Sequence, residues 1–161
     1  MVTDFMDELM VQKRVNDMAG VLQARGFRLT PQRLAIVKIL AENRQHSSAD
    51  QIYTIIRQVF PTISLATVYK TVEVLLATGQ IHEVSFVDGR SHYDGTQAQP
   101  HPHLVCTRCK TIIDVEVEGF EALPEKVAVT YGYKNVGHRL EFFGICPRCQ
   151  AETASAGIQL P

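Results

Sequence analysis

The four cysteines of the chain form two CxxC pairs, CTRC and CPRC, and this arrangement constrains the fold more than any other feature. Two such pairs are typical of a tetrahedral zinc site with four thiolate ligands. A thioredoxin-like redox pair is the alternative, but that motif begins a helix after a strand, and two pairs that use every cysteine favour zinc. We therefore predict structural Zn(II) bound by four ligands: Cys106, Cys109, Cys146 and Cys149.

The 36 residues between the two pairs exceed the usual zinc-ribbon gap, so they must contain folded structure. The hydrophobic pattern predicts strands at HLVC, TIIDVEV and NVGHRLEFFGIC, with a helix at about 119–131 between the last two. A unit of about 65 residues has a small core, and a structural metal commonly stabilises units of that size.

The first half of the chain has the pattern of four helices. Periodic apolar positions predict them at about 4–24, after Thr30-Pro31, from Ser48 and at 64–79. Ser48 begins a capping-box pattern that Gln51 completes. Two apolar stripes are expected to face a core: Ile52, Ile55, Ile56, Val59 and Phe60 on the third helix, and Leu65, Val68, Val72, Leu75 and Leu76 on the fourth.

The period changes after the fourth helix. IHEVSFV and SHYD flank Asp88-Gly89, which predicts a β-hairpin with a tight turn. Helices followed by a two-stranded hairpin have the outline of a winged helix-turn-helix, and the turn-rich GTQAQP predicts a hinge. We therefore predict an α+β fold: a winged helix-turn-helix domain at 1–94, a hinge at 95–100, a small metal-binding α/β domain at 101–150 and a frayed tail at 151–161.

The fourth helix is a candidate reader of double-stranded DNA. Its inward stripe leaves Ala66, Thr67, Lys70 and Thr71 outside, with Tyr69 at the margin, and small side chains there allow close approach to a groove. A solvated amphipathic helix is the alternative, but the hairpin and the acid-free stretch that holds Arg28 favour DNA. The net charge of −1 predicts weak binding by one subunit, so we expect a homodimer that reads a palindromic operator. The expected contacts are Arg28, Ala66, Thr67, Tyr69 and Lys70.

A second group of metal ligands lies beside the first CxxC pair. His101 and His103 alternate on a predicted strand and therefore share a face, Asp94 precedes them, and Asp114 follows on the next strand. Nitrogen and oxygen donors without thiolate suit Fe(II), Mn(II) or Zn(II), whereas histidines exposed on a polar loop are the alternative. We therefore predict two metal sites, one structural and one with mixed ligands.

The N-terminus MVTDFMDELM lacks the basic region of a secretory signal, and no apolar run approaches the ~18 residues of a membrane span. We expect a cytoplasmic protein without a membrane partner, in which thiols stay reduced.

At these motifs the chain resembles the ferric uptake regulator family. The resemblance is carried, in order and at family spacing, by GFRLTPQRLAIVKIL, HSSADQIY, SLATVYKTVEVLLATGQI, HPHLVCTRC and HRLEFFGICPRC. It implies a homodimeric, metal-dependent transcriptional repressor, not an enzyme, with an N-terminal winged helix and a C-terminal α/β dimerisation domain. The same four cysteines are the structural zinc ligands that the resemblance implies.

The resemblance also implies the ligands of a regulatory Fe(II) or Mn(II) ion: His46, Asp94, His101, His103 and Asp114. Aspartate at 94 and 114, where the iron-responsive branch typically has glutamate, resembles the peroxide-sensing branch. That branch responds by oxidation of ligand histidines, here His46 and His101. A further family site would use the positions of Pro100, Pro102, Glu121 and His138. Because the prolines supply no side-chain ligand, we expect His138 to pack or hydrogen-bond locally instead.

Two other functions remain open. A regulator that senses metal concentration, not oxidant, would use the same types of ligand. An enzyme would be a non-haem iron oxygenase or a thiol oxidoreductase. An oxygenase needs open coordination positions, for which five donors leave little room, and a thiol enzyme would keep reactive thiols in the metal-loaded protein.

Overall fold

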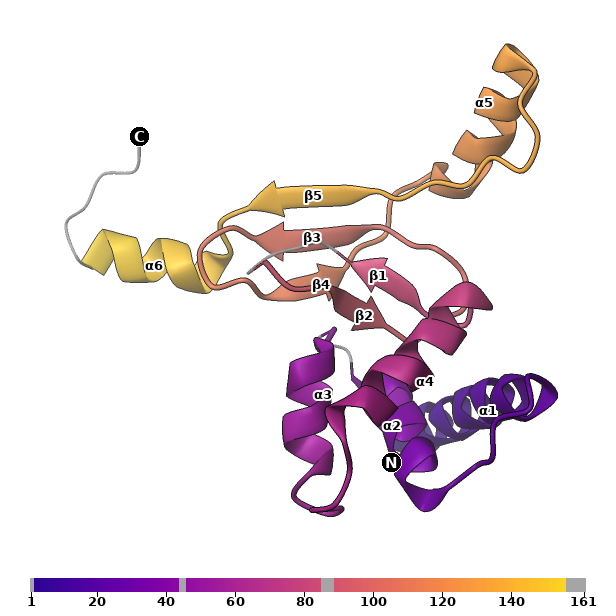
Figure 1. Ribbon diagram of the computed structural model, residues 1–161. Coiled ribbons are helices and arrows are strands. Elements are labelled where there is room, and N and C mark those ends of the chain that lie inside the picture. The colour runs from indigo at the N-terminus through magenta and orange to yellow at the C-terminus, as the bar shows by residue number, and fades with distance from the viewer. Residues whose placement is uncertain (1, 44–45, 85–88, 156–161) are drawn as a thin grey trace. The chain divides into compact units, whose positions relative to one another are not determined.

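The computed structural model describes residues 2–43, 46–84 and 89–155, and the chain divides between Ala98 and Gln99 into two compact units (Figure 1). The first unit contains α1 (Val2–Ala24), α2 (Pro31–Glu42), α3 (Ala49–Ile56), α4 (Leu65–Ala77), β1 (His82–Val84) and β2 (His92–Asp94). The second contains β3 (His103–Cys106), β4 (Ile112–Asp114), the 3-10 turn η1 (Phe120–Ala122), α5 (Leu123–Tyr131), β5 (Glu141–Gly144) and α6 (Pro147–Ser155). This is the predicted α+β fold, a winged helix-turn-helix followed by a small α/β domain.

Helices α2 and α3 begin at the predicted caps, and α4 begins directly after Ser64, where its start was predicted. Thr30 accepts a hydrogen bond from the backbone N–H of Arg33, and Pro31 occupies the first turn of α2. Ser48 and Gln51 form both bonds of the capping box. The Ser64 hydroxyl accepts from the third residue of α4 in the same way. Because each cap satisfies an N–H group that the helix leaves open, it stabilises its helix by about 1 kcal/mol.

The core of the first unit is built from side chains of all four helices. Its fully buried members include Met18, Leu22, Ile36, Val37, Ile52, Val68 and Leu75. Two residues of the predicted α3 stripe do not join it, since Ile55 and Val59 are 45% and 72% exposed. Helix α3 ends at Ile56, so the helical period that would carry Val59 inward does not continue.

Thr71 was predicted on the outer face of α4 and is instead fully buried. It lies three residues after Val68 and four before Leu75, which places it on the buried stripe. Its hydroxyl donates to the Thr67 carbonyl oxygen at 2.8 Å, so burial leaves no unsatisfied donor.

The predicted hairpin is present as an antiparallel pair of strands after α4. His82 of β1 lies opposite Asp94 of β2, and Val84 lies opposite His92. Residues 85–88, with the Asp88 half of the predicted turn, lie outside the described residues. Gly89 has a φ of 79°, which favours glycine over other residues.

The second unit is a three-stranded sheet in the order β4-β3-β5. Strands β3 and β4 are antiparallel, with His103 opposite Asp114, and β3 and β5 are parallel. Its buried apolar side chains are few, chiefly Val105, Ile112 and Phe120, and α5 buries none of its residues. Such a small core agrees with the need for a metal in this half of the chain.

Four predicted elements at the C-terminal end of the chain differ from the structure. Strand β4 covers three of the seven residues predicted at 111–117, and β5 covers four of the twelve predicted at 135–146. Asn135, the first residue of the second predicted strand, has a φ of 54°, in the left-handed region that a strand does not contain. The predicted helix at 119–131 is divided into η1 and α5. The tail after Gln150 is helical as far as Ser155, because Pro147 starts α6 at its first position. Residues 156–161 lie outside the described part.

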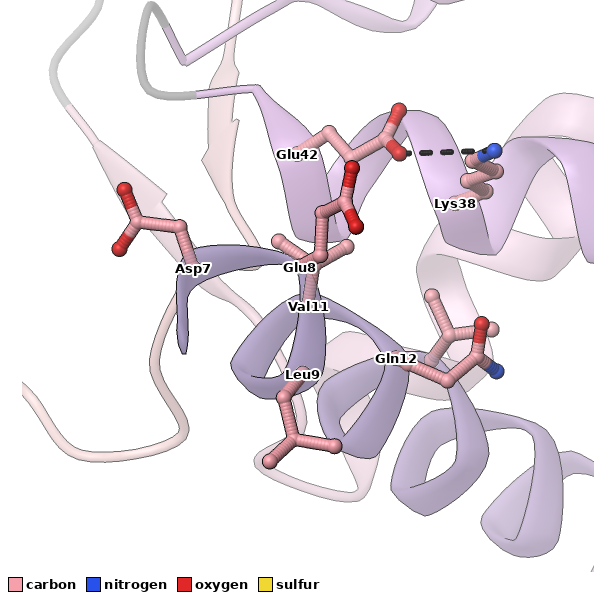
Figure 2. A pocket seen from close by; sticks show the side chains of 8 residues that line it. Asp7, Glu8, Leu9, Val11, Gln12, Lys38 and Glu42 are labelled. Atoms are coloured by element: carbon pink, nitrogen blue, oxygen red, sulfur yellow. Dashed lines mark ion pairs between the residues drawn. The ribbon is translucent and has the colours of Figure 1, made fainter. Parts of the chain in front are cut away.

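Helix α1 borders an open hollow of about 640 Å³ in the first unit (Figure 2). Lys38 and Glu42 of α2 line this hollow and form an ion pair, with Lys38 Nζ 3.6 Å from Glu42 Oε1. The remaining lining residues are Asp7, Glu8, Leu9, Val11, Gln12 and Val15. This lining includes no histidine or cysteine, so it lacks the ligand types of the predicted metal sites. None of the helices in the described ranges is long and apolar enough to cross a membrane.

Candidate metal centres

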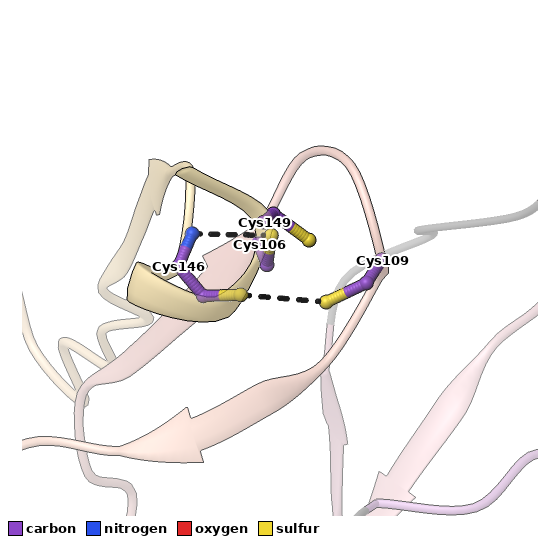
Figure 3. A group of neighbouring side chains, drawn as sticks. All are labelled: Cys106, Cys109, Cys146 and Cys149. Atoms are coloured by element: carbon purple, nitrogen blue, oxygen red, sulfur yellow. Dashed lines mark hydrogen bonds between the residues drawn. The ribbon is translucent and has the colours of Figure 1, made fainter. Parts of the chain in front are cut away.

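The four predicted zinc ligands converge in the second unit (Figure 3). Each cysteine offers one sulfur, and the four sulfurs lie within 4.8 Å of one another. Cys109 Sγ is 3.7 Å from Cys146 Sγ, close to the ~3.8 Å edge of a tetrahedron with Zn–S bonds of about 2.3 Å. A disulfide would need about 2.05 Å, and all four cysteines are free thiols. The donor set therefore fits a closed tetrahedral zinc site.

A turn after β3 and the start of α6 bring these sulfurs together. Cys106 ends β3, and a turn in which Lys110 (φ 66°) donates to the Cys106 carbonyl at 2.9 Å returns the chain to β4. Cys146 directly precedes α6, and its backbone N–H donates to Cys106 Sγ at 3.3 Å. The N-terminal end of a helix and a backbone N–H both favour the anionic form of a nearby thiol.

The thiols differ strongly in acidity before metal is bound. A hydrogen bond from the Thr111 hydroxyl, at 3.2 Å from Sγ, is the first cause that lowers the pKa of Cys109 to about 5. Burial raises the pKa of Cys149 to about 12. Hydrogen bonding to Cys109 in turn raises the pKa of Arg148. One thiolate is thus ready at neutral pH, whereas Cys149 must lose a proton to bind a metal.

Three of the predicted regulatory ligands also meet in the second unit. His101 and His103 have ring centroids 4.5 Å apart, although the strand begins only at His103. Their Nε2 atoms lie 3.3 and 3.6 Å from Asp114 Oδ1, and one ligand atom from each residue lies within 4.8 Å of the others. His101 Nδ1 is 3.1 Å from the Gln99 carbonyl, which can only accept, so Nδ1 carries the proton. A neutral His101 therefore presents a lone pair to a carboxylate, an arrangement that a shared cation stabilises.

The other two predicted ligands belong to the first unit. His46 and Asp94 are fully buried, and His46 Nε2 is 3.8 Å from Asp94 Oδ1. Asp94 ends β2, and Oδ1 accepts hydrogen bonds from the backbone N–H and the hydroxyl of Thr96, at 2.9 and 2.7 Å. The side chain of Asp94 is thus fixed in place before any ion arrives.

Sequence patterns missed two polar residues around that pair. His92 of β2 is buried, with Nδ1 2.6 Å from the His46 carbonyl oxygen. Arg14 of α1 is buried, and its Nε donates to the Gly95 carbonyl at 2.9 Å. A signal for Arg14 does exist in the sequence, because it lies on the same helical stripe as Val11, Val15 and Met18. For His92 no short motif gives a comparable signal.

Four of the five predicted DNA contacts occupy exposed positions on the first unit. Ala66, Tyr69 and Lys70 of α4 are exposed, and Thr67 is half-buried. Arg28 is also exposed, and its carbonyl oxygen accepts a hydrogen bond from Arg33 Nη1 at 2.7 Å. These positions leave the functional groups accessible to a partner.

The additional family position His138 packs locally, as expected. Its ring lies edge-on against Phe120, with centroids 4.1 Å apart. Phe120 is one of the few buried aromatic side chains of the second unit, so this contact extends the small core.

A winged helix-turn-helix joined to a small α/β unit with a tetrathiolate cluster defines a class of metal-binding regulatory protein. The sequence model of the Ferric uptake regulator family matches residues 24–143, and the chain belongs to this family. It is 36% identical over 146 residues to the ferric uptake regulation protein of Bacillus subtilis (strain 168), covering 88% of this chain and 98% of that protein. It is 33% identical over 140 residues to the peroxide operon regulator of the same organism, covering 87% and 96%.

A solved structure has the same fold. The ferric uptake regulator Fur of Helicobacter pylori superposes with a TM-score of 0.71 at 23% identity, covering 87% of this chain and 93% of that chain. At that identity the likeness supports the fold, and the family membership rests on the sequence matches.

Proposed function

We propose that this protein is a metal-dependent, DNA-binding transcriptional repressor that senses peroxide through a regulatory Fe(II) or Mn(II) ion. The observation that carries this proposal is the separation of donor types. Sulfur donors form one complete tetrahedral set, and imidazole and carboxylate donors form other groups that contain no sulfur. Soft thiolates hold zinc permanently, whereas nitrogen and oxygen donors bind exchangeable Fe(II) or Mn(II).

Zinc has a structural role in this proposal. Cys106, Cys109, Cys146 and Cys149 would hold it, and a four-sulfur set leaves no position for a substrate. The second unit buries few apolar side chains, so the ion replaces core that the fold lacks. Reduced thiols require a reducing compartment, which supports a cytoplasmic location.

The regulatory ion would be held by five side chains: His46, Asp94, His101, His103 and Asp114. Two carboxylates balance the charge of a divalent ion, and ligands from both units would link the units when the ion binds. Metal binding shifts the equilibrium between the linked and unlinked arrangements of the units only by the difference in the ion's affinity for these two states. An ion that binds the linked state about 100-fold more tightly shifts the equilibrium by about 2.7 kcal/mol.

The linked state would place two copies of α4 on DNA. Exposed Ala66, Tyr69 and Lys70 support a role of α4 in a major groove, with Thr67 and Arg28 beside it. Apolar side chains of the second unit support a homodimer, since Phe143, Val129, Tyr131 and Tyr133 are 61–79% exposed in one chain. A two-fold dimer reads a palindromic operator with two half-sites.

Peroxide sensing follows from the choice of ion. Bound iron would supply the electron transfer that cleaves the O–O bond of hydrogen peroxide, which manganese would not supply. Overall the peroxide would be reduced by two electrons: one oxygen would leave as water, and the other would pass to a ligand ring that loses the same two electrons. The side chains expected to gain oxygen are His46 and His101. A ring that has been oxidised is a poorer ligand, so the link between the units is lost and DNA is released. The pair of aspartates at 94 and 114 supports this assignment by resemblance.

A second candidate is a regulator that senses ion concentration. The 36% identity to a ferric uptake regulation protein, beside 33% to a peroxide operon regulator, favours neither function over the other. In this alternative the same five ligands would hold the ion, and DNA affinity would depend on metal occupancy alone.

The deciding experiment compares DNA binding of the zinc-loaded protein without a second metal, with Mn(II) and with Fe(II), before and after low peroxide. We expect both metals to raise DNA affinity, and peroxide to abolish it for the iron form alone. Mass spectrometry should find an added oxygen atom on His46 or His101 in that form. Retained DNA affinity with no oxidised histidine would support the concentration sensor instead. His46→Ala should bind neither metal at this site and serves as the matched control.

A further inference from the structure

One strand of the hairpin holds the segment that contains His46. His92 Nδ1 is 2.6 Å from the His46 carbonyl oxygen, and the Tyr93 backbone N–H donates to the Ser47 carbonyl at 3.1 Å. Ser48 and His92 also form an isolated antiparallel bridge. Asp94, which follows Tyr93 and ends the strand, has its carboxylate oxygen Oδ1 3.8 Å from His46 Nε2. Three consecutive buried residues of β2 therefore all contact the segment 46–48.

The backbone of His46 is in an unfavourable conformation. Its φ is 54°, in the left-handed region that non-glycine residues rarely adopt. Such a conformation persists only where surrounding contacts hold it. Its own N–H makes a long bond to the Asn43 carbonyl, at 3.4 Å. The short contact from His92 to the carbonyl group is the stronger constraint on this residue.

The direction of that contact is defined by its chemistry. A carbonyl oxygen accepts only, so Nδ1 of His92 carries the hydrogen and donates it. Because a side chain follows the direction set by its backbone, fixing the His46 carbonyl also fixes the path of its imidazole toward Asp94.

We propose that His92 is a positioning residue for the regulatory metal, which holds His46 in the left-handed conformation that directs its imidazole at Asp94. This inference rests on the proposed function, because it requires His46 and Asp94 to be ligands. His92 acts through the His46 backbone and does not itself bind the ion. The hairpin strand and the ligand pair of the first unit then form one rigid piece, so movement of the ligands and movement of the hairpin are coupled.

The test uses the full-length, zinc-loaded protein and titration with Mn(II). His92→Leu and His92→Ser remove the donor, whereas His92→Asn retains one, because the amide N–H₂ of asparagine occupies nearly the place of Nδ1–H. We expect a loss of about 10- to 100-fold in Mn(II) affinity for His92→Leu and His92→Ser, the usual effect of losing a group that orients a ligand. His92→Asn should stay within about 3-fold of the unmodified protein, well below that range.

DNA binding separates positioning from general destabilisation. At saturating Mn(II) the His92→Leu protein should regain normal DNA affinity, because all five ligands are present. The control is His82→Leu, which removes an equivalent bond from a histidine of the same hairpin, Nε2 to the Ala98 carbonyl at 2.7 Å. This variant should bind Mn(II) normally.

Three outcomes would overturn the inference. These are unchanged Mn(II) affinity in the folded His92→Leu and His92→Ser proteins, equal losses in His92→Asn and His92→Leu, or an equal loss in His82→Leu. His46→Ala, titrated in parallel, distinguishes failure of the proposed function. If that variant binds Mn(II) normally, the regulatory site itself is misassigned; if it loses Mn(II) while His92→Leu does not, only the role of His92 fails.

Discussion

Arg14 and Gly95 are 81 residues apart in sequence, and Arg14 Nε donates a 2.9 Å hydrogen bond to the Gly95 carbonyl. The same guanidinium donates through Nη1 to Gln80 Oε1 at 3.0 Å, and through Nη2 to the Gln80 carbonyl. Gln80 precedes β1 and Gly95 follows β2. A single side chain of α1 therefore joins the two ends of the hairpin. Burial lowers the pKa of Arg14, and the charges of Asp17 and Asp94 oppose that shift.

Replacing this arginine should destabilise the protein. Arg14→Met keeps much of the apolar length but leaves the acceptors on Gln80 and Gly95 without their donors. We expect a loss of about 3 kcal/mol in the free energy of unfolding, since each buried acceptor left unsatisfied costs about 1–3 kcal/mol. Denaturant unfolding monitored by circular dichroism measures the change. Lys13→Met, at an exposed neighbouring position, should change stability by less than about 0.5 kcal/mol.

Two glycines should respond to alanine in opposite directions. A Cβ on Gly95 would lie 2.7 Å from the Leu40 carbonyl oxygen, so Gly95→Ala forces the chain away from α2 and should cost about 1–3 kcal/mol. Gly20 lies within α1 with nothing within 4 Å of an added Cβ, so Gly20→Ala should stabilise by about 0.5–1 kcal/mol. Unfolding midpoints that move in the same direction would contradict this account.

The apolar surface of the second unit makes a prediction about assembly. Phe143 of β5 is 61% exposed in the single chain, and we expect Phe143→Glu to convert a dimer to monomer by placing a charge in a dry interface. Analytical ultracentrifugation at micromolar concentration measures the mass. Val59→Glu alters a residue that is 72% exposed in the first unit and should leave the mass unchanged. A dimeric Phe143→Glu protein would place the interface elsewhere.

Zinc uptake should depend on pH because the four thiols ionise differently. Cys109, with a pKa lowered to about 5, is already a thiolate at neutral pH. Cys149, with a pKa raised to about 12, still carries its proton, which zinc must displace. Apparent zinc affinity of the metal-free protein should therefore rise at least about tenfold per pH unit between about pH 6 and 8. Competition with a chromophoric chelator measures this affinity, and a flat profile would contradict the four-thiolate site.

The same shifts predict opposite contributions to the stability of the metal-free fold. The pKa of Cys109 is lowered from its ordinary value of 9, so its contribution is present above pH 9 and is lost as pH falls toward 5. The pKa of Cys149 is raised, so its contribution is present below pH 9 and is lost as pH rises through 12. Cys109→Ser should remove the first dependence and leave the second.

The exposed lysine of α4 makes a prediction about DNA. Lys70→Gln should weaken binding of the Mn(II) form and reduce the slope of log affinity against log salt by about 1, if it contacts a phosphate. Fluorescence anisotropy at several salt concentrations gives both numbers. Lys134→Gln removes an exposed charge of the second unit and should leave the slope unchanged. Equal salt slopes for the two variants would show that Lys70 does not contact a DNA phosphate.

Local patterns predicted much of the fold. The caps at Thr30 and Ser48 were confirmed because capping depends on residues three positions apart. The convergence of the four cysteines could be predicted because they form two CxxC pairs and one zinc ion needs four ligands. The burial of Thr71 was missed because only apolar residues were assigned to the inward face of α4. Thr71 lies on that face by its helical position, and the hydrogen bond from its hydroxyl to the Thr67 carbonyl allows it to be buried.

The remaining features join residues that are distant in sequence. The contact of His92 with His46 spans 46 positions, and that of Arg14 with Gly95 spans 81. Each arises only after helices and hairpin have packed, so no short window of sequence contains it. His46 itself was expected as a ligand from the family resemblance alone, because a histidine in a polar loop has no periodic signal. Its burial and left-handed backbone became visible only in the folded chain.

Helix α1 ends at Ala24, the residue at which the family match begins, so Arg14 lies upstream of the matched segment. An expression boundary chosen from that match would discard Arg14, whose side chain bonds both ends of the hairpin. A protein shortened only at its N-terminus, to that boundary, would keep all nine proposed metal ligands and the whole of α4 and still respond poorly to metal. Comparisons among relatives that start their alignments at the matched segment would overlook the same dependence.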